Sequence, residues 1–141
     1  MTGFIGWIGT GPQADRAQEI LAGMGRAAGF EGITPVAAEA HFAVAIRPGV
    51  YPMSHHREAG LCTVIMGRPR WLDTKLAAAA ANDSPASALA HAWRQEGTNV
   101  LKKLVGNFSL IVIDGERFMA AIDRVGIHTL SYAADSGGLV F

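Results

Sequence analysis

The sequence has no excess of charge of either sign. Its 12 Lys and Arg residues balance its 12 Asp and Glu residues, and only 17% of the chain is charged. Nucleic-acid binding depends on a basic surface, and attachment to a membrane surface depends on a basic or amphipathic segment. Neither feature is present, so we expect no nucleic-acid partner and no membrane partner.

Cysteine is scarce, and long apolar runs are missing. The single cysteine, Cys62, excludes an internal disulfide and any metal site built from several cysteines. It lies in an apolar run, which favours a core position. No run reaches the ~20 apolar residues of a membrane helix, and the N-terminus has no basic segment of the kind that opens a signal peptide. We therefore expect a cytoplasmic protein.

Apolar residues, by contrast, are abundant enough to build a core. They make up half of the 141 residues, which is typical of one folded domain, so we expect a single domain over residues 1–141. The periodicity predicts strands at 3–8, 42–46, 61–66 and 107–113, helices at 13–28, 72–81 and 85–96, a short helical segment at 100–105, and further strands after 117. This order predicts an α+β domain of two stacked antiparallel sheets between helices. The chain stops at Phe141 within an expected strand, which suggests that the domain is cut there.

Local signals set several boundaries. Asp73 lies near the positive end of the helix predicted at 72–81 and favours it, and Ser84 with Pro85 suits the start of the next helix. Residues 30–40 are weakly patterned, and residues 50–60 are expected to form a loop. That loop contains His55 and His56, which would point in opposite directions on an extended chain. They are poor joint metal ligands, so we expect no metal site.

The first nine residues read as a short apolar strand with Thr2 at its tip. If Met1 were removed, Thr2 would combine a hydroxyl group with a free α-amino group. These are the two groups that an N-terminal nucleophile requires. The hydroxyl group attacks, and an amine of pKa about 7.7–8.0 can act as the general base near neutral pH. The alternative is an ordinary buried first strand with an inert threonine. These nine residues alone favour the ordinary strand.

Three groups of segments carry a family resemblance. They are residues 1–6 (MTGFIG), residues 82–84 (NDS) before 88–93 (ALAHAW), and the set 106–114 (GNFSLIVID), 121–132 (AIDRVGIHTLSY) and 138–141 (GLVF). In this order the chain resembles the glutaminase domain of asparagine synthetase-type amidotransferases. The resemblance implies an N-terminal nucleophile hydrolase fold, which is a four-layer αββα sandwich. It also implies glutamine as the ammonia donor.

Within this resemblance, the residues at the catalytic positions depart from the family. At the position of the family's nucleophilic cysteine, this sequence has Thr2. At the position of the arginine that binds the substrate carboxylate, it has Phe42 or Ala43. Its oxyanion-binding Asn-Gly pair is Met66 and Gly67. Gly67 remains as an oxyanion donor, and Asp83 remains at the position that binds the substrate ammonium.

Two functions follow from the resemblance. The first is a degenerate glutaminase-like domain that serves a synthetase domain or subunit. That partner would form asparagine, a β-lactam or a lasso peptide, and ATP and Mg²⁺ would be expected only there, with no cofactor in this domain. The second is an active N-terminal-threonine amidohydrolase, in which Thr2 attacks glutamine, Gly67 binds the oxyanion and Asp83 binds the ammonium group.

Overall fold

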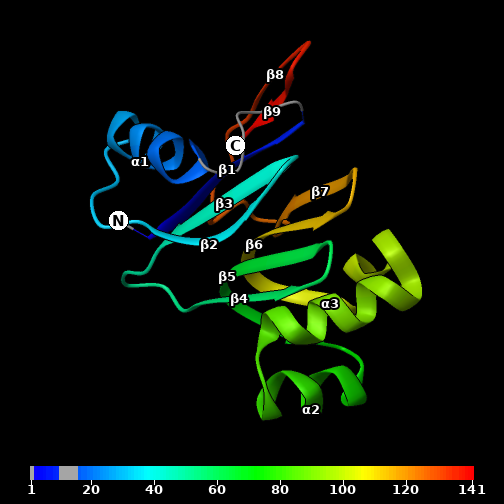
Figure 1. Cartoon of the computed structure of the whole chain (residues 1–141). Helices are drawn as coiled ribbons and strands as arrows, with labels where there is room; N and C mark the ends of the chain where they lie inside the picture. The colour runs from blue at the N-terminus through cyan, green and yellow to red at the C-terminus, as the bar shows by residue number, and fades with distance from the viewer. Residues whose placement is uncertain (1, 10–15) are drawn as a thin grey trace. The chain divides into compact units, whose positions relative to one another are not determined.

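The computed structural model describes residues 2–9 and 16–141, which form two compact units (Figure 1). Unit 1 joins the N-terminal part of the chain, up to Tyr51, to Ser131–Phe141, and unit 2 is Pro52–Leu130. The elements of unit 1 are β1 (Gly3–Gly9), α1 (Ala17–Ala27), β2 (Thr34–Glu39), β3 (Phe42–Arg47), β8 (Ala133–Asp135) and β9 (Gly138–Val140). Those of unit 2 are β4 (Met53–Glu58), β5 (Leu61–Trp71), α2 (Thr74–Asn82), α3 (Pro85–Glu96), the 3₁₀ helix η2 (Gly97–Lys103), β6 (Leu104–Asp114) and β7 (Arg117–Ile122).

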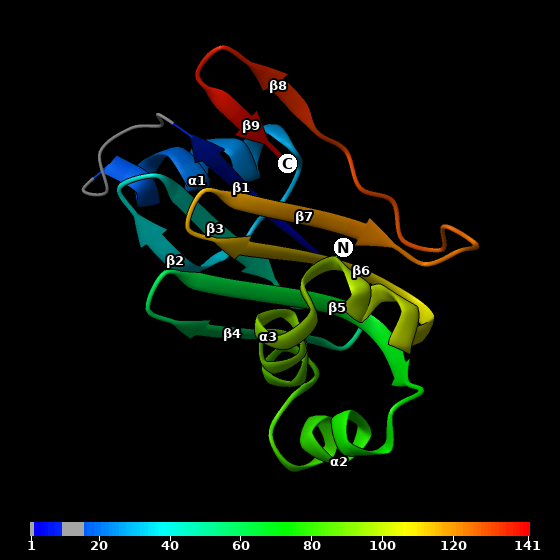
Figure 2. The ribbon, with the colours of Figure 1, turned by 90° about the vertical axis from the view of Figure 1, so that its right-hand side faces the viewer.

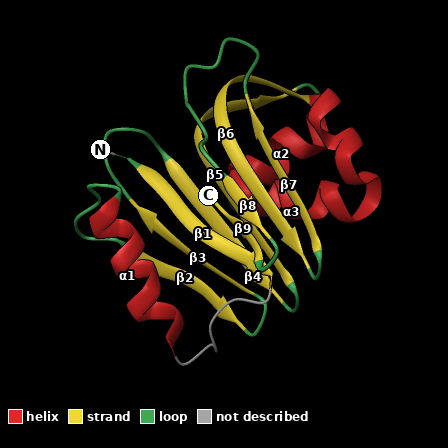
Figure 3. Ribbon diagram, turned by 90° about the horizontal axis from the view of Figure 1, so that it is seen from above, coloured by secondary structure: helices red, strands yellow, loops and turns green. Residues whose placement is uncertain are grey.

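Unit 1 is an antiparallel sheet in the order β2-β3-β1-β9-β8, with α1 beside it. The predicted first strand is the middle strand of this sheet, and it pairs with β3 on one side and β9 on the other. Figure 3 shows α1 lying along β1, β2 and β3. Leu21 of α1 is fully buried in a core cluster with Ile5 and Trp7 of β1. The helix ends before Gly29 (φ +71°), as predicted, while its predicted start at 13–15 lies outside the described residues.

Unit 2 is an antiparallel sheet in the order β4-β5-β6-β7 (Figure 2). The two longest strands, β5 and β6, each have 11 residues and pair along their whole length. Alternate residues of β6, beginning with Phe108 and Leu110, join Leu89 and Trp93 of α3 in one buried cluster. Leu89 and Trp93 lie one helical turn apart, so they share the buried face of α3.

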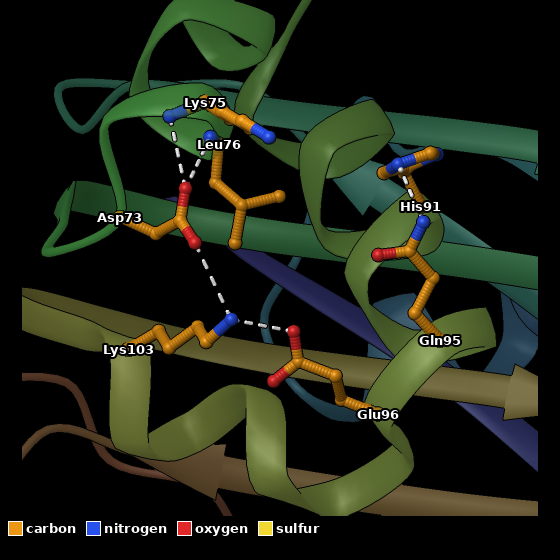
Figure 4. A network of polar contacts seen from close by, with 7 residues as sticks. All are labelled: Asp73, Lys75, Leu76, His91, Gln95, Glu96 and Lys103. Carbon is orange, nitrogen blue, oxygen red and sulfur yellow. Dashed lines mark hydrogen bonds and ion pairs between the residues drawn. The ribbon is translucent and has the colours of Figure 1, made fainter.

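One side-chain cap and one lysine connect the helices of unit 2 (Figure 4). The Asp73 carboxylate accepts hydrogen bonds from the backbone N–H groups of Lys75 (2.9 Å) and Leu76 (3.2 Å), so it caps α2 as expected. Lys103, the last residue of η2, places its ammonium group 2.6 Å from Glu96 and 3.3 Å from Asp73. The end of α3, the end of η2 and the start of α2 are therefore joined through one side chain.

The second sheet is larger than the sequence predicts. The expected loop at 50–60 is wrong, because Met53–Glu58 forms the edge strand β4. The expected end of the next strand at residues 67–70 is also wrong, because β5 continues through Pro69 to Trp71. Pro69 is tolerated because β4 pairs with β5 only as far as Met66, so the missing N–H group faces an open edge.

Two further differences are smaller. The weakly patterned residues 30–40 contain the edge strand β2, and the helical segment expected at 100–105 ends earlier, where β6 begins at Leu104. The α+β class with antiparallel sheets is confirmed. The four-layer arrangement and the N-terminal nucleophile hydrolase fold stay predictions. Among the described helices, none combines the length and apolar character that crossing a membrane requires.

Candidate functional site

Thr2 lies directly before β1 in unit 1. Its side chain is held in place, because Thr2 Oγ1 accepts a hydrogen bond from the backbone N–H group of Tyr51 at 3.2 Å. The residue is half-buried, so its hydroxyl group is partly open to solvent. Met1, whose removal the threonine mechanism requires, lies outside the described residues. The structure therefore gives Thr2 a defined orientation at the tip of the central strand of its sheet.

The two positions to which the resemblance assigns the family's arginine lie in β3 of the same unit. Phe42 and Ala43 are both fully buried. In the antiparallel register Ala43 lies opposite Trp7 of β1, inside the sheet. Neither side chain carries a charge or a hydrogen-bond donor, so neither can bind a substrate carboxylate as an arginine would.

Gly67 lies in β5 of unit 2, and its backbone explains why a glycine is present. Its φ angle is +106°, and a Cβ atom there would collide with the carbonyl oxygen of Asn107 and lie 3.0 Å from His128 Nε2. The N–H group of Gly67 donates a hydrogen bond to the carbonyl oxygen of Pro52 at 2.8 Å. The amide expected to bind an oxyanion is thus already engaged by the protein. Met66, beside it, is buried and offers no donor.

Asp83 lies at the junction of α2 and α3. It is the C-cap residue of α2, where its backbone N–H group donates to the carbonyl oxygen of Ala79 at 3.0 Å. The residue is exposed. Its neighbour Ser84 caps α3 by accepting a hydrogen bond from the backbone N–H group of Ser87 at 3.1 Å. Asp83 can therefore receive a cationic group from solvent, and the turn between two capped helices fixes its backbone.

A small pocket of about 80 Å³ lies beside Gly67 in unit 2, and Asp83 is not among its lining residues. It is lined by Pro52, Met53, Ser54, Ile65, Gly67, Pro69 and Pro85. The lining is mostly apolar, and the pocket is well below the roughly 300 Å³ at which ligand sites usually begin. Of the predicted site residues in unit 2, only Gly67 contributes to this pocket.

Two buried residues near Gly67 were missed by the sequence analysis. Asp123 is 5% exposed and His128 is 4% exposed, and both lie in the segment that follows β7. His128 directs Nε2 toward Gly67, as the 3.0 Å approach to its Cβ position indicates. The pattern Asp-x-x-Gly at residues 123–126 was a usable signal for a turn held by an aspartate side chain.

The Asp123 carboxylate is surrounded by backbone donors. Its oxygens accept hydrogen bonds from the N–H groups of Phe108 (3.2 Å), Val125 (2.9 Å) and Gly126 (2.9 Å). Burial raises the pKa of Asp123, but the hydrogen bonds from Val125, Phe108, Ile127 and Gly126 outweigh burial and hold the pKa below its ordinary value. Asp123 is therefore a charged anchor for its turn.

The two histidines of β4 differ in their exposure. His55 is exposed, whereas His56 is half-buried with Nε2 3.7 Å from Glu58 Oε1, as expected for neighbours on opposite faces of a strand. Within residues 2–9 and 16–141, no group of three or more His, Cys, Asp and Glu side chains is placed to hold a metal ion.

Comparison with known proteins identifies the family. A family model described as a glutamine amidotransferase domain matches residues 43–141, which include Ala43, Met66, Gly67 and Asp83 but not Thr2. Comparisons with curated proteins and with solved structures gave no match. The family match extends over more than half of the sequence. The chain therefore belongs to the glutamine amidotransferase domain family.

Proposed function

We propose that this chain is a glutaminase-like domain with a degenerate active site, acting as the structural partner of an ATP-dependent, amide-forming synthetase module. The observation that carries the proposal is the hydrogen bond from the Gly67 N–H group to the Pro52 carbonyl oxygen. It engages the one oxyanion donor that the chain retains. An occupied donor cannot stabilise the negative charge that develops during amide hydrolysis.

The residues at the other altered positions also lower the expected rate of glutamine hydrolysis. Met66 supplies no oxyanion donor, and losing one such donor typically lowers the rate by about 10²–10³. Ala43 supplies no charged contact to the glutamine carboxylate, so the substrate loses its bidentate anchor. Thr2 offers a hydroxyl group, which ionises far less readily than a thiol. These losses fall on different steps, so we expect glutamine hydrolysis to be negligible.

The chemistry of the complex would then belong to the partner. The synthetase module would bind ATP and Mg²⁺ and activate a carboxylate for attack by an amine, as in an asparagine synthetase, a β-lactam synthetase or a lasso-peptide cyclase. The present domain would contribute a folded surface and no cofactor. Because such a partner consumes ATP, we propose that both act in the cytoplasm.

An active threonine amidohydrolase is the second candidate. The observation that favours it is the hydrogen bond from the Tyr51 N–H group, which holds Thr2 Oγ1 in one orientation at the tip of β1. In that mechanism, the Thr2 amine takes the proton of its own hydroxyl group as Oγ1 attacks the glutamine amide. Asp83 would bind the substrate ammonium group. Gly67 would have to release Pro52 before it could bind the oxyanion.

Two measurements on the purified protein separate these candidates. Intact mass spectrometry first determines whether Met1 is retained, since retention removes the free amine that the threonine mechanism needs. Ammonia release from glutamine is then compared between the natural protein and Thr2→Ala. We expect equal, background-level release. A clear loss of ammonia release in Thr2→Ala would contradict the degenerate-domain proposal.

A second experiment tests the same proposal by restoring the family's residue types at two positions. The double variant Thr2→Cys, Met66→Asn restores the family's residue types at the nucleophile and at one oxyanion donor. We expect it to remain inactive, because Ala43 still provides no carboxylate anchor and Gly67 still donates to Pro52. Glutaminase activity in this variant would mean that the rest of the site is intact.

A further inference from the structure

In unit 2, one end of the β5–β6 pair extends beyond both neighbouring strands. β5 and β6 pair over residues 61–71 and 104–114. β4 pairs with β5 only as far as Met66, and β7 pairs with β6 only from Ser109 onward. Residues 67–71 and 104–108 therefore form a two-stranded ribbon, which we name the β5–β6 extension. Figure 2 shows β5 continuing past the end of β4 toward α2.

Two arginines lie on one face of the β5–β6 extension. Gly67 and Pro69 line the small pocket of unit 2, and Trp71 packs against the core cluster that contains the buried residues of α3. Because successive side chains of a strand point to opposite faces, Arg68 and Arg70 lie together on the other face. Both arginines are exposed, so their guanidinium groups are available to a ligand from solvent.

The protein itself does not neutralise these two positive charges. Within the part of the chain that the structure describes, neither Arg68 nor Arg70 forms an ion pair. Four acidic side chains of unit 2 pair with other basic residues: Glu58 with Arg94, Asp114 with Arg117, and both Asp73 and Glu96 with Lys103. Two like charges on neighbouring positions of one strand face repel each other, and an anion bound between them removes that repulsion.

Asn107 supplies a third donor beside the arginines. It lies directly opposite Arg68 in the register of β5 and β6, and residues that lie opposite each other share a face of the sheet. Asn107 Oδ1 accepts a hydrogen bond from the backbone N–H group of Arg68 at 2.9 Å, which holds the side-chain amide next to that arginine. The Nδ2 group of the same amide is still a hydrogen-bond donor. Two cationic donors and one neutral donor therefore lie on one face.

The backbone beneath these donors is held in place. The Gly67 N–H group donates to the Pro52 carbonyl oxygen at 2.8 Å, and just past the other end of the extension the Leu72 N–H group donates to the Lys103 carbonyl oxygen at 2.8 Å. Between the two arginines, Pro69 has a φ angle fixed by its ring. A ligand would therefore order only side chains, which lowers the free-energy cost of binding.

We propose that the β5–β6 extension binds a phosphate group through the guanidinium groups of Arg68 and Arg70 and the side-chain amide of Asn107. A phosphate monoester carries about −1.5 to −2 charges at pH 7 and three acceptor oxygens, which match two positive charges and three donor groups. A carboxylate carries one charge and two oxygens, and so matches less well. The inference goes beyond the proposed function, because neither arginine is a predicted site residue for glutamine.

Titration with inorganic phosphate tests the proposal on the complete chain. Backbone amide signals are followed by ¹H–¹⁵N NMR while sodium chloride holds the ionic strength constant. We expect saturable shifts confined to residues 67–71 and 104–108, and about ten-fold weaker binding of acetate, which offers fewer charge-assisted hydrogen bonds. Shifts that do not saturate, shifts elsewhere, or equal affinity for acetate would overturn the phosphate site.

A pair of charge variants separates a site from general charge attraction. The double variant Arg68→Gln, Arg70→Gln should weaken phosphate binding about ten-fold or more. The matched control Arg26→Gln, Lys75→Gln removes the same two charges from exposed positions on α1 and α2 and should leave the affinity unchanged. Equal weakening in both double variants would overturn the site. Because all four side chains are exposed, the urea midpoints should match that of the natural protein.

The variant Asn107→Asp tests the third donor. Aspartate keeps an oxygen that can accept the Arg68 N–H hydrogen bond, but it replaces the Nδ2 donor with a negatively charged oxygen. Phosphate binding should fall about ten-fold or more while circular dichroism stays unchanged. An unchanged affinity for phosphate in Asn107→Asp would overturn the three-donor site.

Discussion

The two units differ in the length of the strands and the number of helices that hold the predicted site residues. Unit 1 contains Thr2 and Ala43 in a sheet whose strands have three to seven residues, and α1 is its one helix among the described residues. Unit 2 contains Gly67 and Asp83 on a frame built from two paired 11-residue strands and two capped helices. Among the described residues, the cluster of unit 2 that contains Trp93 has fourteen buried residues, and the cluster of unit 1 that contains Leu21 has six.

The proposed function implies that the framework of such a domain can be kept while its chemistry is lost. In unit 2, the caps at Asp73 and Ser84 and the positive φ angle at Gly67 are all in place. At Thr2, Ala43 and Met66, in both units, the residues differ from those that the family resemblance assigns to glutamine binding and hydrolysis. A domain that serves as a scaffold needs the helix caps and the backbone geometry of Gly67. It does not need side chains that act on glutamine. The predictions below test how strongly unit 2 depends on each part of that frame.

The largest effect is expected at Trp93. Its ring is 3% exposed in the core of unit 2, its Nε1 donates to Asp114 Oδ2 at 2.9 Å, and the Arg117 guanidinium lies 4.8 Å from the ring centroid. Trp93→Ala should lower the free energy of unfolding by about 3–5 kcal/mol. Urea unfolding followed by circular dichroism measures the loss. The matched change Trp71→Ala, at a half-buried position, should cost less.

The next largest loss of stability is expected at Gly67 in β5, and Gly60 in the turn before β5 is its matched control. Gly67→Ala forces a side chain against the Asn107 carbonyl oxygen at φ +106°, and we expect a loss of about 3 kcal/mol. Gly60 also has a positive φ angle, +72°, but nothing lies within 4 Å of its Cβ position. Gly60→Ala should therefore lower the free energy of unfolding by only about 1–2 kcal/mol in the same urea experiment. Equal losses would show that packing around Gly67 is unimportant.

Much of the frame of unit 2 was predictable because its signals are local. Ser84 followed by Pro85 marks a helix start through hydrogen bonding and a fixed φ angle, and the structure confirms both roles. By contrast, Met53–Glu58 is polar and reads as a loop, yet it forms β4 because it pairs with the buried strand β5. That pairing is a tertiary interaction, which local propensity does not encode.

The candidate site was predictable only in its residue types. The family resemblance names Thr2, Gly67 and Asp83 as site residues, which stays a prediction. It did not indicate that the Gly67 N–H group donates to Pro52. That bond depends on where β4 begins, and β4 itself was missed. The buried state of Asp123 and His128 was missed as well, since both are polar residues in a turn segment. Their burial depends on contacts with β6 and β5.

A smaller effect is expected at the cap of α3. Ser84 Oγ accepts the hydrogen bond from the Ser87 N–H group, so Ser84→Ala leaves that donor without its partner. The free energy of unfolding should fall by about 1 kcal/mol. Ser87→Ala is the matched control, since it removes a serine from the same turn but keeps the capping bond. A loss in Ser87→Ala as large as that in Ser84→Ala would argue against the cap as the cause.

The smallest effect is a pH dependence at the cap of α2. The hydrogen bond from the Leu76 N–H group lowers the pKa of Asp73 most strongly, burial opposes it, and Lys103 and the Lys75 N–H group lower the pKa further. Because the folded pKa lies below the unfolded value of about 3.9, the stabilisation is complete above that pH and disappears as the pH falls through the folded pKa.

The urea midpoint of Asp73→Asn should therefore lie below that of the natural protein at pH 7 and approach it as the pH falls through the folded pKa of Asp73. Ser84→Ala provides the control, because a serine cap does not titrate and its difference from the natural protein should persist across the same range. A constant difference for Asp73→Asn would mean that hydrogen bonding by the side chain, which asparagine can also provide, matters more than its charge. In that case the bridge through Lys103 would contribute little to the frame of unit 2, and the helix caps alone would distinguish unit 2 from unit 1.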